Sequence, residues 1–300
     1  MKNTKKNLLQ RDFFREVMPD LLDHLKQRSI KFTEAQAHRV ALKVKEMEEF
    51  QPVVAILGKT GSGKSSLSNA IFGRDAAAVS DTEACTRTPT KYIVHVAKGK
   101  SIALLDVPGV GESSVRDTEY HDLYKLLIPK VDLILWVIKA DDRALAIDQS
   151  IWASCIKPYL DSGSPIFIVV NQVDKLNPVR EWNVQECKPG PNQNILIHDK
   201  VRAMSAAFGL APERVLPVSA LEKYNISDLV EAIIFALPNE KKLPFVNAVA
   251  DEVVSEPAKK EAKRGFIAAV SDFIKNSFEV VAPYIPTIVD ILKIVLFRRK

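Results

Sequence analysis

From residue 52 onward, short apolar runs alternate with longer segments in which apolar residues recur every three or four positions. This alternation predicts parallel β-strands that are separated by helices. Residues 131–138 and 166–170 are almost wholly apolar, which is typical of strands buried on both faces of a sheet. The other predicted elements are strands at 52–57, 90–96, 101–105 and 214–218, and helices at 66–72 and 226–237.

Turn residues and one proline refine this sheet. Residues 90–96 and 101–105 flank Lys98-Gly99-Lys100, so we expect them to form an antiparallel hairpin. Pro217 has no backbone N–H, which favours an edge position for the last strand or a position at the end of that strand. The Pro-Gly-Pro run within residues 182–193 predicts a surface loop. The fold class is therefore α/β, with a doubly wound, mostly parallel sheet.

Helical extensions are predicted on both sides of this α/β domain, which spans residues 51–240. Residues 1–50 contain apolar positions among many charges, a pattern that predicts two amphipathic helices with a break near residues 29–33. Further on, Pro244 and Pro257 indicate a linker, after which apolar residues dominate. Residues 241–300 are accordingly predicted to form a linker and an apolar helical tail.

The tail leaves three interpretations open. Residues 280–297 are mostly apolar and are followed by Arg298-Arg299-Lys300, so the run approaches a membrane span with flanking cations. Its three- and four-residue spacing favours instead one apolar face of a helix. That face would pack on the α/β domain or on another chain, or residues 266–300 would contact a membrane peripherally. Two prolines and two charges burden a true span: Pro283, Pro286, Asp290 and Lys293.

Composition bounds the class of protein without identifying a partner. Of the 300 residues, 47% are hydrophobic and 26% are charged, as in an ordinary globular protein. The net charge of +5 is explained by a solvated basic surface as well as by an anionic partner. Charges near the N-terminus argue against a secretory signal. Three widely spaced cysteines predict reduced thiols in the cytoplasm rather than zinc or disulfides: Cys85, Cys155 and Cys187.

Residues 58–65 read Gly-Lys-Thr-Gly-Ser-Gly-Lys-Ser and match the full G-x-x-x-x-G-K-[ST] phosphate-loop pattern. They stand between an apolar strand and a helix, where backbone amides and the helix N-terminus bind phosphate. Lys64 would reach the β- and γ-phosphates, and Ser65 would ligate Mg²⁺. The motif predicts a P-loop NTPase. The nucleotide-binding residues predicted here are Gly58, Lys59, Thr60, Gly61, Ser62, Gly63, Lys64, Ser65 and Ser66.

A second phosphate-side motif, Asp106-Val107-Pro108-Gly109, follows an apolar strand. The Asp106 carboxylate is suited to holding Mg²⁺ through water, and the Gly109 N–H to meeting the γ-phosphate. A threonine between the phosphate loop and Asp106 must complete the Mg²⁺ coordination and sense the γ-phosphate. Residues 81–89 offer several candidates, among them Thr86 and Thr88.

The motif Asn171-Gln172-Val173-Asp174 follows the strand that ends at Val170 and is similar to the Asn-Lys-x-Asp guanine signature. The Asp174 carboxylate can accept from both N1–H and N2–H₂ of guanine, whereas adenine has an acceptor at N1. Gln172 replaces the lysine whose stem covers the base, which predicts weaker stacking. The last predicted strand closes on Ser219-Ala220-Leu221, where the Ala220 amide would contact guanine O6.

Together, the motifs over residues 52–237 resemble those of the Era/TrmE-like P-loop GTPases. Runs that resemble the bacterial YfjP-like GTPases lie at 106–112, 117–120, 132–136 and 139–144. The resemblance implies a G domain and Mg²⁺-dependent hydrolysis of GTP to GDP and phosphate as a molecular switch. Because Thr86-Arg87 is similar to a Thr-Arg pair of Era-like GTPases, Thr86 is preferred to Thr88 as the Mg²⁺ ligand. The implied catalytic residues are Lys64, Thr86 and Gly109.

Two departures from related GTPases concern catalysis: Val110 predicts slow intrinsic hydrolysis, and Gly61 argues against activation by potassium. Val110 stands where Ras-type enzymes have a water-orienting glutamine, and Gly61 stands where potassium-activated relatives have an asparagine. Glu112, Arg87 or a residue from a partner or second subunit could supply the missing group, although Glu112 and Arg87 also fit as solvated switch residues. Trp136 is expected in the core. Asp141 and Asp142 are expected to cap the next helix.

Three functions compete on these grounds. The first is a cytoplasmic GTP switch with an effector or activating protein; a ribosome or RNA target follows from family analogy alone. The second is a membrane-associated GTPase, either dynamin-like or tethered, at the inner face of the membrane through its tail. The third is a nucleotide-binding interaction module with negligible turnover. A GTP-dependent dimer is a further possible assembly.

Overall fold

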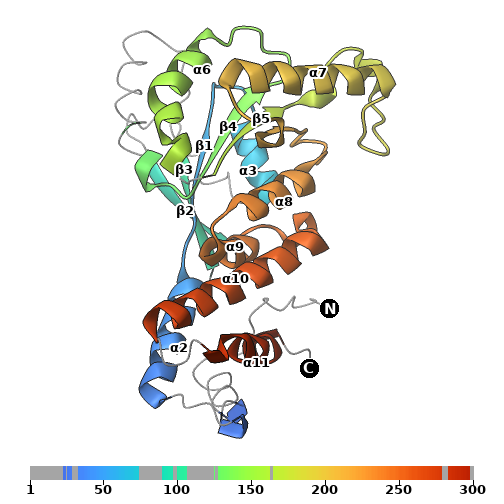
Figure 1. The fold of residues 1–300 in the computed structure, drawn as a ribbon. Coiled ribbons are helices and arrows are strands. Elements are labelled where there is room, and N and C mark those ends of the chain that lie inside the picture. The colour runs from blue at the N-terminus through green and yellow to red at the C-terminus, as the bar shows by residue number, and fades with distance from the viewer. Residues whose placement is uncertain are drawn as a thin grey trace. The chain divides into compact units, whose positions relative to one another are not determined.

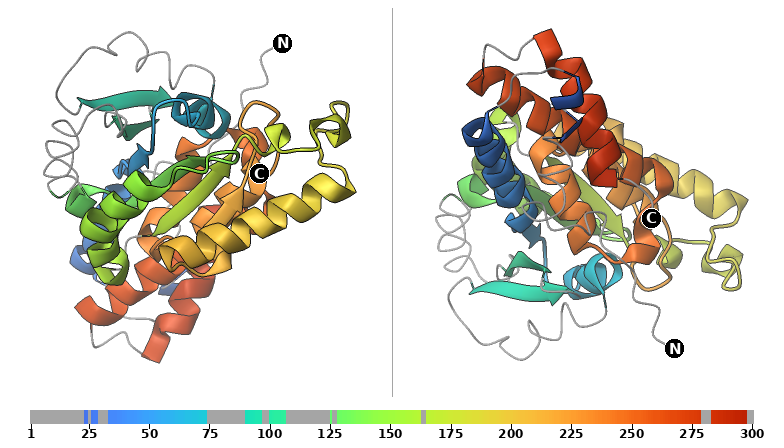
Figure 2. Two further views of the ribbon diagram at one scale, coloured as in Figure 1. Left: turned by 90° about the horizontal axis from the view of Figure 1, so that it is seen from above. Right: turned by 90° about the horizontal axis from the view of Figure 1, so that it is seen from below.

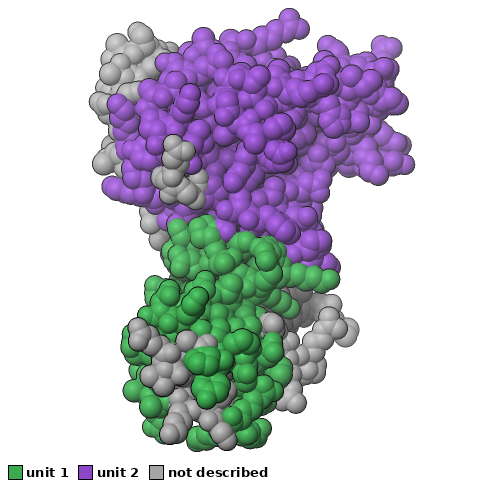
Figure 3. All heavy atoms as spheres, in the orientation of Figure 1, with its two compact units in different colours: residues 1–50, 238–247, 259–300 green, residues 51–237, 248–258 purple. Residues whose placement is uncertain are grey.

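The computed structural model describes residues 23–24, 26–28, 33–73, 90–96, 100–106, 125, 128–162, 165–278 and 283–297. The chain divides into two compact units (Figure 3). The larger unit comprises residues 51–237 and 248–258, and the smaller comprises residues 1–50, 238–247 and 259–300. The domain limits predicted from the sequence, at residues 50 and 240, remain a prediction. A compact unit is not by itself a domain, because a domain must also be able to fold independently.

The larger unit is built on a six-stranded sheet in the order β2-β3-β1-β4-β5-β6 (Figure 1). All neighbouring strands are parallel except the β2–β3 hairpin, which is antiparallel as the sequence predicts. Strand β6 lies at an edge, which confirms the position inferred from Pro217. The strands are β1 (Val53–Leu57), β2 (Thr90–Val96), β3 (Lys100–Asp106), β4 (Leu133–Lys139), β5 (Ile166–Asn171) and β6 (Val215–Pro217).

Helices cover both faces of this sheet, which confirms the predicted doubly wound α/β fold (Figure 2). Helices α6 and α7 pack on one face, where Trp136 of β4 lies in a core with Trp152 and Phe208. Helices α3 and α8 contact each other and cover the other face. Every residue of β5 is buried, as its unbroken apolar sequence predicts. The helices are α3 (Lys64–Phe72), α6 (Ala146–Ile151), α7 (Pro191–Phe208) and α8 (Ile226–Ala236).

The smaller unit is helical. Helix α2 (Glu34–Glu49) begins with a capping box in which Thr33 and Gln36 bond each other's backbone N–H, and it buries a stripe of apolar residues. The other helices are α9 (Asn239–Ala248), α10 (Glu256–Ser277) and α11 (Ile285–Phe297), whose outermost residues at 248 and 256–258 belong to the larger unit. Across the described parts of the chain, no helix combines the length and apolarity needed to cross a membrane.

The two prolines that suggested a linker lie within helices. Pro244 is inside α9, and Pro257 is the second residue of α10, where a missing N–H removes no intrahelical bond. Both helices bury apolar side chains, including Phe245 and Phe266. Burial in a helical unit therefore decides the structure here more than the local proline signal does.

A buried ion pair joins α9 to α10. The Lys242 ammonium contacts the Glu261 carboxylate, and each side chain is only 6% exposed. Arg264 Nη2 also lies 2.7 Å from Glu261 Oε2. Hydrogen bonds from Arg264, and the contact with Lys242, hold the pKa of Glu261 below its ordinary value of 4.5 despite burial. This carboxylate therefore contributes its full stabilisation above pH 4.5 and loses it as the pH falls through its lowered pKa.

We predict that Glu261→Leu lowers the free energy of unfolding by about 3 kcal/mol, because it leaves the buried Lys242 ammonium without this carboxylate. The double variant Lys242→Met, Glu261→Leu should recover most of the loss, since both charges are removed together. Urea unfolding followed by circular dichroism measures both. Equal destabilisation of the single and double variants would show that the charge pair is not the cause.

Candidate guanine-nucleotide site

The phosphate loop, residues 58–65, connects β1 to α3 at the carboxyl edge of the sheet. Two of its glycines are required by close packing. Gly58 and Gly63 have φ angles of 138° and 91°, which side chains rarely adopt. A Cβ atom at Gly58 would overlap the carbonyl of Val137 on β4, and one at Gly63 would overlap the Asn171 amide. The phosphate loop thus lies against the carboxyl-terminal parts of β4 and β5.

The Lys64 side chain folds back over its own loop. Its Nζ donates to the carbonyl oxygens of Gly58 at 3.0 Å and Lys59 at 3.1 Å. The Lys59 carbonyl also accepts from Ser62 N at 3.2 Å. The Ser62 hydroxyl is buried and makes no hydrogen bond with the described residues. The start of α3 therefore combines a cation, a buried hydroxyl and helix-terminal amides, a set that suits an anion.

Asn171, at the end of β5, ties three predicted loops together. Its side chain is 1% exposed, and its Nδ2 donates to the Ser62 carbonyl at 2.9 Å. Its Oδ1 accepts from the Ala220 amide at 3.1 Å. One buried amide thus joins the phosphate loop, the base loop (residues 171–175) and the last-strand loop (residues 218–221).

Gln172 makes a second link between the base loop and the phosphate loop. Its Nε2 donates to the Gly61 carbonyl at 2.9 Å, and its Oε1 accepts from Lys175 Nζ at 2.9 Å. The residue has a left-handed φ of 64°. Although glutamine lacks the long stem of the lysine it replaces, it reaches the phosphate loop and connects the two segments.

Asp174 lies in a short 3₁₀ turn, Val173–Lys175, with one carboxylate oxygen buried and without a hydrogen-bond partner among the described residues. Gln193 supports this turn from α7. Its wholly buried side chain donates from Nε2 to the carbonyls of Asp174 at 3.2 Å and Leu176 at 2.8 Å. The sequence analysis missed Gln193, because a single glutamine at the end of a predicted loop gives no signal of this packing.

The last-strand loop brings Ser219 and Ala220 beside Asn171. Both residues are buried, whereas Leu221 is 76% exposed. The Ala220 N–H, which we predicted to contact guanine O6, donates to Asn171 Oδ1 in this structure. A base carbonyl at this point would have to share that donor with Asn171.

Part of the predicted phosphate side lies outside the described residues: Thr86, Arg87, Thr88, Gly109, Val110 and Glu112. Asp106 is the last residue of β3 and pairs with Ile56 of β1, so its backbone is at the same sheet edge as the phosphate loop. Ser65 lies in the first turn of α3 and is exposed. Hydroxyl and carboxylate oxygens are donors that Mg²⁺ prefers, so Ser65 and Asp106 fit this ion by chemistry. Within the described ranges, no cluster of three or more His, Cys, Asp or Glu offers another metal site.

The connection between β4 and α6 corrects one expectation. Asp142 and Asp141 do not cap α6, because the N-cap residue is Leu145 and makes no side-chain capping bond. Asp142 Oδ1 accepts instead from Ala144 N at 2.8 Å within the connection, and its Oδ2 lies 2.9 Å from Lys59 Nζ.

Comparisons with known proteins agree with this geometry. A family model described as a 50S ribosome-binding GTPase matches residues 53–172. The chain is 33% identical to the uncharacterized protein YfjP of Escherichia coli K12, across 86% of this chain and 88% of YfjP. It is also 33% identical to YkfA of the same strain, across 82% and 84% of the two chains. GTPase Era of Aquifex aeolicus is 28% identical across 63% of this chain and 58% of Era.

Among solved structures, a variant of Aquifex aeolicus Era bound to GDP and AlF₄⁻ is 27% identical, with a TM-score of 0.42, over 62% of this chain and 56% of that chain. The assignment rests on the sequence relatives, which define a P-loop GTPase. The chain belongs to the Era-like family of P-loop GTPases, together with YfjP and YkfA. It binds guanine nucleotide and hydrolyses GTP.

We predict that Asn171→Ala lowers the free energy of unfolding by about 2 kcal/mol, because it leaves the Ser62 carbonyl and the Ala220 N–H without their buried partner. GDP affinity should fall as well, since the three loops are no longer joined. Urea unfolding and calorimetric titration with GDP measure these effects. The control is Asn194→Ala on α7, which should change neither quantity. Wild-type behaviour of Asn171→Ala would contradict the joining role.

Proposed function

We propose that this GTPase is a Mg²⁺-dependent molecular switch whose base loop selects guanine. The observation that supports it best is the buried, unpartnered oxygen of Asp174. It lies in a loop that Asn171 and Gln172 hold against the phosphate loop. A buried carboxylate oxygen without a donor is unfavourable unless a ligand supplies one.

Guanine supplies the donors that this oxygen lacks. Its N1–H and N2–H₂ groups are adjacent and both point to the carboxylate side, whereas adenine would bring an acceptor to the same place. Gln193 holds the backbone of the Asp174 turn, so the carboxylate is positioned before the base arrives. Rejection of adenine follows from the unpaired buried charge that it would leave.

The phosphate loop binds and orients the triphosphate. On nucleotide entry, the Lys64 ammonium exchanges the carbonyls of Gly58 and Lys59 for the β- and γ-phosphates. Water then attacks the γ-phosphorus in line, a bond forms to the water oxygen, and the bond to the β–γ bridging oxygen breaks. Lys64 and the loop amides stabilise the charge that develops on the phosphate oxygens.

Mg²⁺ would be held by the Ser65 hydroxyl, by the Asp106 carboxylate through water, and by a threonine hydroxyl, with Thr86 preferred to Thr88. When bound, the ion neutralises negative charge on the phosphates. Thr86 and the Gly109 N–H would contact the γ-phosphate only in the GTP state, and this difference between GTP and GDP is what makes a switch.

The matching family is described as ribosome-binding, so the 50S subunit is the first partner to test in both nucleotide states.

We expect Asp174→Asn to weaken GTP binding about 100-fold, equivalent to about 3 kcal/mol, because an amide cannot accept both guanine protons. XTP should bind this variant better than it binds the wild type, since xanthine has a carbonyl at C2 that accepts from the amide. Competition binding with labelled GDP measures both nucleotides. Asp141→Asn, on an exposed carboxylate, is the matched control. An unchanged preference for GTP over XTP would refute the assignment of Asp174.

The Mg²⁺ requirement is tested at Ser65. Ser65→Ala removes the hydroxyl and should raise the Mg²⁺ concentration for half-maximal single-turnover GTP hydrolysis about tenfold, whereas Ser65→Thr retains the hydroxyl and should stay close to wild type. If the alanine and threonine variants show the same Mg²⁺ dependence as the wild type, Ser65 is not a ligand of the ion.

A further inference from the structure

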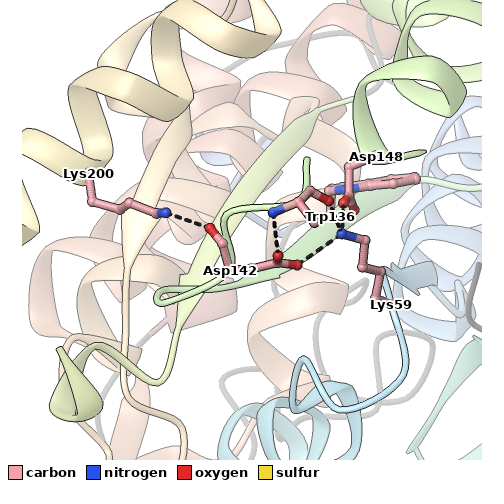
Figure 4. A network of polar contacts seen from close by, with 6 residues as sticks. Lys59, Trp136, Asp142, Asp148 and Lys200 are labelled. Carbon is pink, nitrogen blue, oxygen red and sulfur yellow. Dashed lines mark hydrogen bonds and ion pairs between the residues drawn. The ribbon is translucent and has the colours of Figure 1, made fainter. Parts of the chain in front are cut away.

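Lys59, the second residue of the phosphate loop, is anchored to the connection between β4 and α6 (Figure 4). Its Nζ lies 2.9 Å from Asp142 Oδ2 and 2.8 Å from Asp148 Oδ2, and it also donates to the Ala144 carbonyl. Only 19% of the Lys59 side chain is exposed. The three acceptors, from Asp142, Ala144 and Asp148, therefore use the hydrogen-bonding capacity of the Lys59 ammonium.

The carboxylates that hold Lys59 are themselves fixed. Asp148, on α6, is 1% exposed and accepts from the indole Nε1 of Trp136 at 3.2 Å. Asp142 accepts from the Ala144 amide, and its carbonyl accepts from Lys200 of α7 at 2.8 Å (Figure 4). These contacts thus connect Lys59 to β4, α6 and α7, which pack in one core. They leave the Lys59 side chain little freedom to move.

Two ammonium groups, those of Lys59 and Lys200, act on the carboxylates of this network. Burial acts to lower the pKa of Lys59, but the contacts with Asp148 and Asp142 outweigh it, and the pKa is raised. Burial likewise acts to raise the pKa of Asp142, and the contacts with Lys59 and Ala144 lower it overall. The lysine therefore remains charged at neutral pH and offsets part of the negative charge of these two carboxylates.

The backbone of the same residue holds Lys64. The Lys59 carbonyl accepts from Lys64 Nζ and from the Ser62 amide, so the side chain and the carbonyl of Lys59 connect the anchor to the phosphate-binding groups. We propose that Lys59 is a positioning residue for the triphosphate, which fixes the start of the phosphate loop through its contacts with Asp142, Asp148 and the Ala144 carbonyl. This inference rests on the triphosphate site proposed above.

The alternative is that the network only stabilises the fold. Lys59→Met separates the two readings when it is combined with Asp148→Asn, a change that removes the buried charge and keeps an oxygen to accept from Trp136. If Lys59 positions the loop, the double variant regains thermal stability but not nucleotide affinity. If the network is only structural, stability and affinity recover together.

The experiment measures affinities for Mg²⁺-GTP, Mg²⁺-GDP and Mg²⁺-XTP alongside thermal unfolding. Lys59→Met should bind GTP and GDP about tenfold more weakly, with an unchanged GTP-to-XTP preference, because the base loop is untouched. Lys59→Arg should recover most of the affinity. Wild-type affinity in Lys59→Met, or recovery of affinity in the double variant, would overturn the inference. Lack of a GTP-to-XTP preference in the wild type would instead refute the proposed guanine selection.

Discussion

The buried amide of Asn171 is the contact on which the proposed nucleotide site depends. Its Nδ2 donates to two carbonyls of the phosphate loop, and its Oδ1 accepts from the backbone of the last-strand loop. Because Asn171 is the last residue of β5, the sheet itself fixes where this amide lies. Its closeness also explains why Gly63 has no side chain, since a Cβ atom there would overlap it. The base loop and the last-strand loop are therefore joined to the phosphate loop by contacts within the protein.

The charged side chains around the phosphate loop also hold this loop in place. A loop proposed to bind a triphosphate must collect positive charge, yet Lys59 of this loop contacts two carboxylates, Asp142 on the connection between β4 and α6 and Asp148 on α6. Lys59 offsets these carboxylates, and Lys64 rests on two carbonyls that it can exchange for phosphate oxygens. Lys242 and Glu261 form a second buried pair of opposite charges, in the helical unit. Such pairing is what makes buried ions tolerable.

The sequence was sufficient for features with a local signature. Apolar runs predicted the strands, and the spacing of glycines, Lys64 and Ser65 predicted the loop between β1 and α3, because both depend on neighbours in the chain. Features that depend on distant contacts were missed or wrong. Nothing near Gln193 indicates that its amide supports Asp174, and Asp142 resembled a helix cap until its partner, 83 residues away, was known. Tertiary packing, rather than local preference, decides these positions.

The central claim is that the three loops are joined in the nucleotide-free protein. Hydrogen–deuterium exchange at the Ala220 amide tests it directly, because this N–H donates to the buried Asn171 side chain rather than to water. The account predicts slow exchange at Ala220 without nucleotide, and only a small further slowing when GDP is added. Rapid exchange without nucleotide that becomes slow only with GDP would contradict it, since the joint would then be made by the ligand.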